Sequence, residues 1–216
     1  MSIKLICSDC NGVLNNVDGD YSKTGWYSTI SKDKPELYQK IHQFVFCDNP
    51  IIMDNERLIP LWMSGKLTYK DVNKILSDNL NVDPSYLDEK LIESAKKLEL
   101  DWNLINLYQK FRKNNVKVFI TSDNMDIFSL FTVPENNLND YCDQVYNSFD
   151  LNCLKHGNDF ELYKQIASDN GLELSEVLIV DDSKEIINKA KEIGFSTYLY
   201  NFDTYMNFEK EMYSDN

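Results

Sequence analysis

The sequence predicts an α/β protein in which a doubly wound parallel sheet, a Rossmann-like core, carries a small all-helical cap domain. Short apolar runs recur along much of the chain, and segments with helical periodicity separate them, which is typical of parallel strands joined by crossover helices. Residues 35–97 differ because they show helical periodicity throughout. The length of 216 residues, 43% of them hydrophobic, allows a core and an inserted domain.

The predicted core strands are apolar runs that end at polar or glycine-containing turns. The first, residues 3–8, is nearly continuous and ends at residues 9–12 (DCNG), as expected for a buried central strand. The other predicted strands are residues 116–120, 145–146, 177–180 and 196–200. The predicted helices between them are residues 101–111, 126–131, 160–170 and 184–193, and glycines follow the last two.

Helix boundary residues mark the inserted block. Gly65 ends one predicted helix, and Thr68 and Asp71 have the spacing of a capping box for the next. Asp83 is an N-cap residue followed by proline at the first helical position. We therefore assign residues 1–14 and 101–216 to the core and residues 15–100 to the cap. Aromatic residues of the cap are expected to form its core, with some of them lining a substrate cleft. They are Trp26, Tyr27, Phe44, Phe46 and Trp62.

Charge and cysteine content exclude several classes of function. The net charge is -13, and no run of Lys or Arg offers the basic surface that a nucleic acid backbone requires, so no nucleic acid partner is expected. The N-terminal apolar run is too short for a signal peptide, and no stretch approaches the length of a membrane span. The five cysteines are expected to be reduced thiols. These features predict a cytoplasmic protein with no membrane partner.

Polar and acidic residues follow three of the predicted strands. In an open parallel sheet the carboxyl ends of the strands meet at one edge, where ligands bind. Carboxylates gathered there repel one another unless a cation compensates, and several oxygen ligands favour Mg2+, which also takes substrate phosphate. Lys155 precedes the third of these strands and is expected to neutralise an anionic substrate. The residues at this edge are Asp9, Asn11 and Gly12, then Thr121, Ser122, Asp123 and Asn124, then Asp181 and Asp182.

Four segments occur in a defined order along the chain. They are residues 9–14 (DCNGVL), residues 119–124 (FITSDN), Lys155 ahead of a helix, and residues 180–183 (VDDS). Together they resemble the four ordered motifs of the haloacid dehalogenase-like (HAD) superfamily, over nearly the whole chain. Residues 61–68 and the helix after them are also similar to part of the cap that members carry after the first motif. The resemblance implies a hydrolase that uses Mg2+ and acts on a small phosphorylated metabolite.

The resemblance further implies a role for each matching residue. Asp9 would be the nucleophile that forms an aspartyl-phosphate, which divides hydrolysis into two easier steps. Lys155 would neutralise the transferred phosphoryl group. Substrate-binding residues would be Ser122, Asp123, Asn124 and Lys155. Metal ligands would be Asp9, the backbone carbonyl of Asn11, Asp181 and Asp182.

Asn11 departs from the family pattern. Phosphatases of the family have a second aspartate there, which protonates the leaving oxygen, whereas the amide of Asn11 exchanges no proton near neutral pH. Loss of general acid–base catalysis costs about 10²–10⁴-fold in rate. Three interpretations follow: a slow phosphatase for activated leaving groups, a phosphatase whose acid comes from the cap, and a catalytically weakened binding protein. A 2-haloacid dehalogenase ranks lower, because carbon–halogen displacement does not need the acid pair Asp181 and Asp182.

Overall fold

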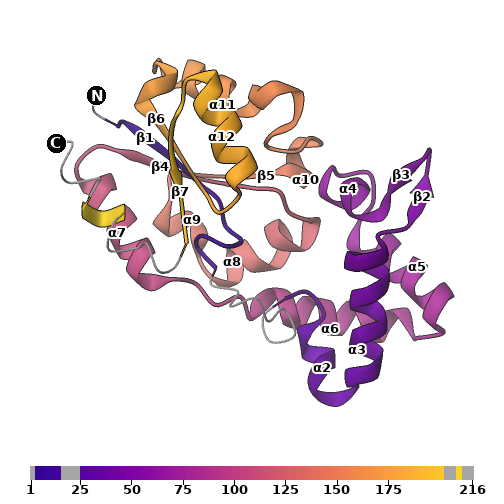
Figure 1. The fold of residues 1–216 in the computed structure, drawn as a ribbon. Helices are drawn as coiled ribbons and strands as arrows, with labels where there is room; N and C mark the ends of the chain where they lie inside the picture. The colour runs from indigo at the N-terminus through magenta and orange to yellow at the C-terminus, as the bar shows by residue number, and fades with distance from the viewer. Residues whose placement is uncertain (1–2, 16–24, 202–207, 211–216) are drawn as a thin grey trace.

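The computed structural model describes residues 3–15, 25–201 and 208–210, and it contains a central sheet with a helical cap beside it (Figure 1). The sheet has five strands in the order β5-β4-β1-β6-β7, and every neighbouring pair is parallel. The strands are β1 (Leu5–Ser8), β4 (Lys117–Ser122), β5 (Gln144–Asn147), β6 (Val177–Asp181) and β7 (Ser196–Leu199). The predicted α/β class and doubly wound sheet are therefore confirmed.

Alternate residues of the central strands face opposite sides of the sheet, and each side is covered by helices. Ile6 packs into a cluster on one side with residues of α7 (Trp102–Lys113), including Leu104. Leu5 and Cys7 pack into a second cluster on the other side. That second side is covered by α11 (Gly157–Asp169) and α12 (Lys184–Ile193). Because both faces of β1 are buried, its near-continuous apolar sequence is explained.

β4 and β6 run further at their carboxyl ends than the sequence predicts, which changes the environment of the residues there. β4 continues through Thr121 and Ser122, because both residues pair with β5. β6 continues through Asp181, which pairs with β7. Hydrogen bonding to a neighbouring strand has therefore ordered polar residues that the apolar pattern alone places in loops.

The cap consists mainly of helices, which are α2 (Ser28–Asp33), α3 (Pro35–His42), α4 (Leu58–Met63), α5 (Tyr69–Leu80) and α6 (Pro84–Lys96). Thr68 and Asp71 form the predicted capping box at the start of α5, and the Asp83 side chain accepts a hydrogen bond from the Ser85 backbone N–H. A π-helical segment, Gln43–Asp48, follows α3 directly.

The cap also contains a two-stranded antiparallel hairpin that an all-helical cap does not include. Its strands are β2 (Ile51–Met53) and β3 (Glu56–Arg57). Asp54 and Asn55 at the turn have φ values of 49° and 64°, a left-handed conformation that these two residue types tolerate. The hairpin was not predicted, although an Asp-Asn pair between apolar and charged residues is a turn signal.

Two residues after β4 belong to the apolar core of the cap. Met125 and Ile127 pack with Tyr27, Trp62 and other buried cap residues. Between them, the Asp126 carboxylate accepts hydrogen bonds from Trp62 Nε1 and from the Tyr69 backbone N–H, both at 2.9 Å. This loop of the core therefore attaches the cap. The proposed division at residues 1–14, 15–100 and 101–216 stays a prediction.

None of the helices in the described part of the chain combines the length and the apolar character needed to cross a bilayer. The predicted polar tail from residue 202 lies outside the described residues except for 208–210, where Phe208 is buried against Tyr198 and Tyr108.

Replacing Asp126 should destabilise the protein, because it leaves donors from the cap buried without an acceptor. We expect Asp126→Ala to lower the free energy of unfolding by about 3 kcal/mol, on the basis of about 1–3 kcal/mol for each buried donor left unpaired. Urea denaturation measures this change. Asp78→Ala, at an exposed position of α5, is the control and should change stability by less than about 0.5 kcal/mol. Equal losses in the two variants would contradict the assignment of Asp126 as the attachment point.

Candidate active site

Asp9 lies directly after β1, at the edge of the sheet where the parallel strands end. The register pairs Ser8 of β1 with Ile120 of β4 on one side and with Val180 of β6 on the other. The Asp9 backbone N–H continues the ladder by donating to the Val180 carbonyl at 2.8 Å. The three strands therefore deliver their next residues to one place, as predicted from the topology.

Lys155 lies in the middle of this place and is almost completely buried. Its Nζ is 2.8 Å from Asp9 Oδ2 and 2.8 Å from Asp181 Oδ2. Burial alone would lower the pKa of Lys155, but the carboxylates of Asp9 and Asp181 raise it well above its ordinary value. Lys155 is therefore charged and holds both acids together.

Burial raises the pKa of Asp9, because it disfavours the charged form of a carboxyl group. Desolvation raises the pKa of Asp9 to about 7, although Lys155 and the Cys10 backbone N–H, which donates to Asp9 Oδ1 at 2.7 Å, both oppose the rise. Asp181 adds to the rise by repulsion. Asp9 thus stays partly protonated near neutral pH unless a further cation joins the site.

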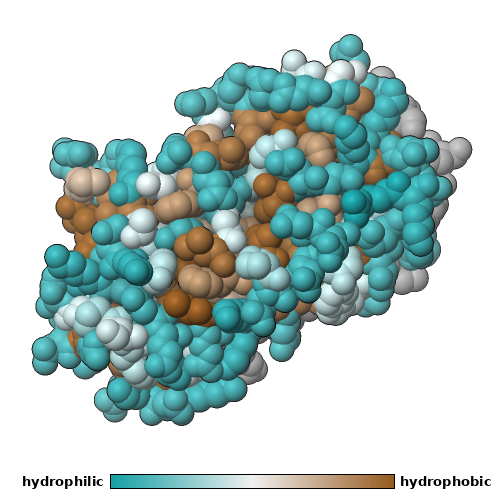
Figure 2. All heavy atoms as spheres, turned by 180° about the vertical axis from the view of Figure 1, so that it is seen from behind, coloured by the Kyte–Doolittle hydropathy of each residue, from teal (hydrophilic) through white to brown (hydrophobic). Residues whose placement is uncertain are grey.

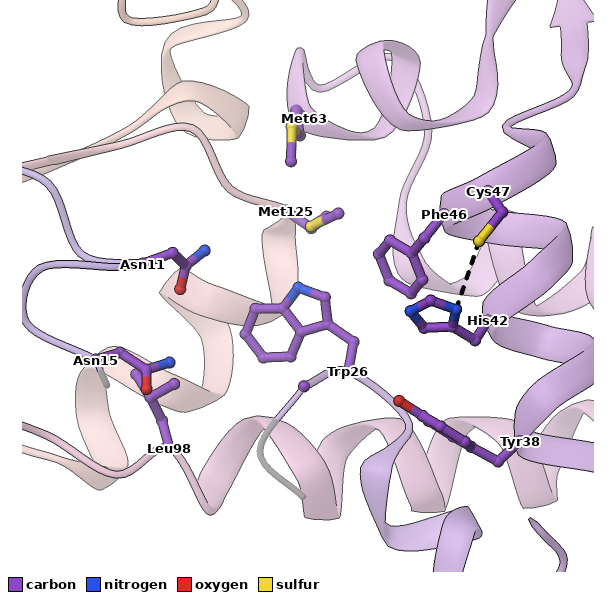
Figure 3. A pocket seen from close by; sticks show the side chains of 11 residues that line it. Asn11, Asn15, Trp26, Tyr38, His42, Phe46, Cys47, Met63, Leu98 and Met125 are labelled. Atoms are coloured by element: carbon purple, nitrogen blue, oxygen red, sulfur yellow. Dashed lines mark hydrogen bonds between the residues drawn. The ribbon is translucent and has the colours of Figure 1, made fainter. Parts of the chain in front are cut away.

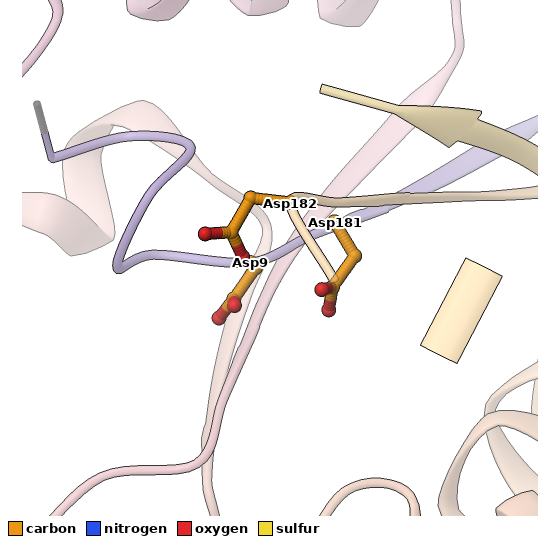
Figure 4. Close-up of side chains that lie close together, drawn as sticks. All are labelled: Asp9, Asp181 and Asp182. Carbon is orange, nitrogen blue, oxygen red and sulfur yellow. The ribbon is translucent and has the colours of Figure 1, made fainter. Parts of the chain in front are cut away.

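Three carboxylates at this edge form a set that fits a divalent cation. Oxygen atoms of Asp9, Asp181 and Asp182 lie within 4.8 Å of one another (Figure 4). Burial and the neighbouring Asp181 raise the pKa of Asp182. One lysine does not balance three acids, and carboxylate oxygens are ligands that Mg2+ accepts. The donor set therefore suits Mg2+.

Gly12 allows Asp182 to approach the loop after β1. A Cβ atom at this position would lie 2.1 Å from Asp182 Oδ2, and Gly12 also has a φ of +79°. Any side chain would push the Asp182 carboxylate away and strain the backbone. The position of Gly12 at this edge follows from the predicted strand order, but no sequence pattern indicates its contact with Asp182.

Asp123 and His156 fix the segment that carries Lys155. Asp123 Oδ1 accepts the Lys155 backbone N–H at 2.7 Å, and Asp123 Oδ2 lies 2.9 Å from His156 Nδ1. That hydrogen bond raises the pKa of His156. Both oxygens of Asp123 are thus engaged within the protein, which favours a positioning role over substrate contact for this residue.

The chain just after Lys155 has an unusual backbone. Asn158, Asp159 and Phe160 have φ values of 47°, 57° and 63° before the regular part of α11 begins. Successive left-handed residues other than glycine are costly, and they persist only where surrounding contacts enforce them. Phe160 is buried among residues of the sheet and α11, which supplies such contacts.

Ser122 and Asn124 lie at the same sheet edge and are both buried. Asn124 Nδ2 is 3.5 Å from Ser122 Oγ, and the Asn124 backbone N–H donates to Ser148 Oγ at 3.0 Å. Ser122 ends β4, the strand that pairs with β1, so its hydroxyl is carried by the strand next to Asp9. The roles predicted for Ser122 and Asn124 stay predictions.

Asn11 borders a cavity of about 430 Å³ between the core and the cap. Figure 3 shows Asn11 and Asn15 on one side of this cavity and His42 and Phe46 of the cap on the other, with the Trp26 indole between them. Phe46 lies on the π-helical segment, a type of irregularity that is frequent at functional sites.

Helical spacing alone does not separate the cavity-lining aromatics from those of the cap core. Tyr27 and Trp62 are fully buried and do not border this cavity, whereas Trp26 and Phe46 line it. His42, a partly buried residue at the end of α3, also lines it. Tyr27 has a φ of 64°, so the backbone turns there and the side chains of Trp26 and Tyr27 point in different directions. A helical pattern in the sequence does not predict this difference.

Known proteins resemble the chain in sequence and in fold. No family model matches the chain. A curated D-ribitol-5-phosphate phosphatase from Bacteroides thetaiotaomicron is 26% identical over 91% of this chain and 91% of its own. A solved HAD-like hydrolase from Porphyromonas gingivalis has 17% identity, 98% coverage of both chains and a TM-score of 0.72. A HAD family enzyme from Bacteroides thetaiotaomicron, an aspartate-to-alanine mutant solved with magnesium and inorganic phosphate, has 19% identity, coverage of 92% and 94%, and a TM-score of 0.68. These likenesses show that the chain has the fold of the HAD family structures.

Proposed function

We propose that the protein is a Mg2+-dependent phosphatase that hydrolyses a small phosphorylated metabolite by way of an aspartyl-phosphate on Asp9. The observation that carries the proposal is the joint placement of Asp9, Lys155 and the Asp181-Asp182 pair at the carboxyl edge of the sheet. A nucleophile, a fixed cation and a set of metal ligands are the parts that phosphoryl transfer by a carboxylate requires. The curated relative acts on D-ribitol 5-phosphate, and the same class of reaction is proposed here.

Each residue of the site has a part in the proposed reaction. Mg2+, held by Asp9, Asp181, Asp182 and the backbone carbonyl of Asn11, would neutralise charge on the phosphoryl oxygens. A carboxylate oxygen of Asp9 attacks phosphorus, and the bond to the leaving oxygen breaks with its electron pair on that oxygen. Lys155 balances the charge of the phosphorylated aspartate. Water then attacks phosphorus, which releases inorganic phosphate and restores the Asp9 carboxylate.

Ser122 and Asn124 are proposed to donate hydrogen bonds to the transferred phosphoryl group. Both are carried by β4 and the loop after it, beside β1. Asp123 is proposed to act through Lys155, since its oxygens hold the backbone of Lys155 and the ring of His156. A cytoplasmic location stays a prediction.

A binding protein without turnover is the second candidate, and Asn11 favours it. The side chain at this position borders the cavity, where a leaving group would lie, yet it provides no exchangeable proton. A dehalogenase remains the weaker alternative, because the three-acid set of Asp9, Asp181 and Asp182 has no purpose in halide displacement.

Magnesium affinity should rise with pH, because Mg2+ has to displace a proton from Asp9. The pKa of Asp9 lies near 7 without metal, so the carboxyl is mostly protonated at pH 6 and mostly ionised at pH 8. We expect Mg2+ to bind about tenfold more tightly at pH 8 than at pH 6, as measured by isothermal titration calorimetry. Asp9→Asn should weaken binding and flatten the pH dependence, whereas Asp78→Asn should change neither. Binding that is independent of pH would contradict the proposed participation of Asp9.

Activity should depend on Asp9 and should be limited by Asn11. With Mg2+ present, wild-type protein should hydrolyse para-nitrophenyl phosphate, whose leaving group needs no protonation, and Asp9→Asn should reduce release of nitrophenol to background. Asn11→Asp should raise kcat on D-ribitol 5-phosphate by about 10²-fold or more, since it restores a general acid. Release of inorganic phosphate measures the second reaction. Absence of Mg2+-dependent hydrolysis in both the wild type and Asn11→Asp would exclude the phosphatase and leave the binding protein.

A further inference from the structure

The cavity beside Asn11 is lined mainly by apolar and aromatic side chains. Trp26, Phe46, Met63, Leu98 and Met125 all border it, and none of its described lining residues is Asp, Glu, Lys or Arg. Viewed from behind, the molecule has hydrophobic surface between the core and the cap (Figure 2). Asn11 borders this cavity and is two residues from Asp9 on the same loop, so a leaving group bound beside Asn11 would extend into the cavity.

Such a lining suits an aromatic ring better than a polyol chain. Each hydroxyl group of a polyol that is buried without a hydrogen-bond partner costs about 1–3 kcal/mol, and the part of the cavity lined by Phe46, Met63, Leu98 and Met125 offers it no strong donor or acceptor. One of the polar groups here, His42 Nδ1, is already 3.7 Å from Cys47 Sγ. A flat ring, in contrast, gains contact with the indole of Trp26 and the ring of Phe46, and aromatic pairs add about 0.5–1.5 kcal/mol beyond the area they bury.

Asn11 favours the same class of substrate for an independent, chemical reason. A phosphate ester of an alkanol needs a proton on its leaving oxygen, which Asn11 does not supply. A phenol has a pKa of about 10, like the tyrosine side chain, so its oxygen leaves as an anion far more readily than an alkoxide does. The lining of the cavity and the missing acid thus select the same leaving group.

We infer that the substrates are phosphate monoesters of phenols. The aromatic ring occupies the cavity between Trp26 and Phe46 while the phosphoryl group contacts Asp9. This inference rests on the proposed phosphatase function. The bond between Asp9 and phosphorus forms as the bond between phosphorus and the aryl oxygen breaks. The electron pair stays on the aryl oxygen, which leaves as a phenolate and takes its proton from bulk water.

The test compares three phosphoryl donors in the presence of Mg2+: phenyl phosphate, acetyl phosphate and D-ribitol 5-phosphate. Acetyl phosphate has an activated leaving group without a ring, so it separates leaving-group acidity from recognition of the ring. We expect wild-type kcat/KM for phenyl phosphate to exceed that for D-ribitol 5-phosphate by at least about 100-fold. We expect Trp26→Ala to lower kcat/KM for phenyl phosphate about 10-fold more than for acetyl phosphate, mainly through KM.

Trp102→Ala is the matched control, because Trp102 is 50% exposed on α7 of the core and does not border the cavity. It should leave both activities unchanged. Equal losses for phenyl and acetyl phosphate in Trp26→Ala, or equal wild-type rates for phenyl phosphate and D-ribitol 5-phosphate, would overturn the aromatic substrate class alone. Absence of Asp9-dependent hydrolysis of acetyl phosphate would overturn the phosphatase function itself, and the inference with it.

Discussion

The ion pairs of Lys155 with Asp9 and Asp181 are the interaction on which the rest of the site depends. A buried ammonium or carboxylate is costly unless a partner of opposite charge lies close to it, and here one ammonium serves two carboxylates at 2.8 Å each. The arrangement needs parallel strands that end together, which place Asp9 and Asp181 side by side, and a separate segment that brings Lys155 between them. Asp123 and the left-handed backbone after His156 hold that segment in place.

The short loop after β4 connects this charged centre to the cap. Asp123 fixes the backbone of Lys155, Asn124 lies beside Ser122, and Asp126 accepts hydrogen bonds from Trp62 and Tyr69 of the cap. Met125 packs into the cap core and also borders the cavity. Residues three positions apart thus position the lysine and attach the cap, so the cavity is located relative to Asp9 by one continuous piece of backbone. Movement of the cap about this loop would alter both the position of Lys155 and the position of the cavity relative to Asp9.

Local patterns in the sequence were sufficient for the sheet and for the acids at its edge. Apolar runs with intervening helical periodicity predict the parallel strands, and topology alone then brings Asp9, Asp181 and Asp182 together. The hairpin at Asp54-Asn55 was missed because its strands are only two and three residues long. Two features of the site depend on contacts between distant segments, namely the ion pairs of Lys155 with two acids and the approach of Asp182 to Gly12. The different directions of Trp26 and Tyr27 depend on a single left-handed residue. No periodicity in the sequence encodes such features.

The charge of Lys155 has a consequence for how an anionic substrate reaches the proposed site. Its single positive charge is already shared by Asp9 and Asp181, and Asp182 adds a further carboxyl, so the edge of the sheet alone would repel a phosphate group. The whole chain, with a net charge of -13, offers no long-range attraction either. A metal ion that first neutralises the acids would both lower the pKa of Asp9 and free part of the Lys155 charge for the phosphoryl group. On the proposed mechanism, metal binding therefore precedes substrate binding. The cavity, whose described lining includes no Asp, Glu, Lys or Arg, contributes contact with the leaving group.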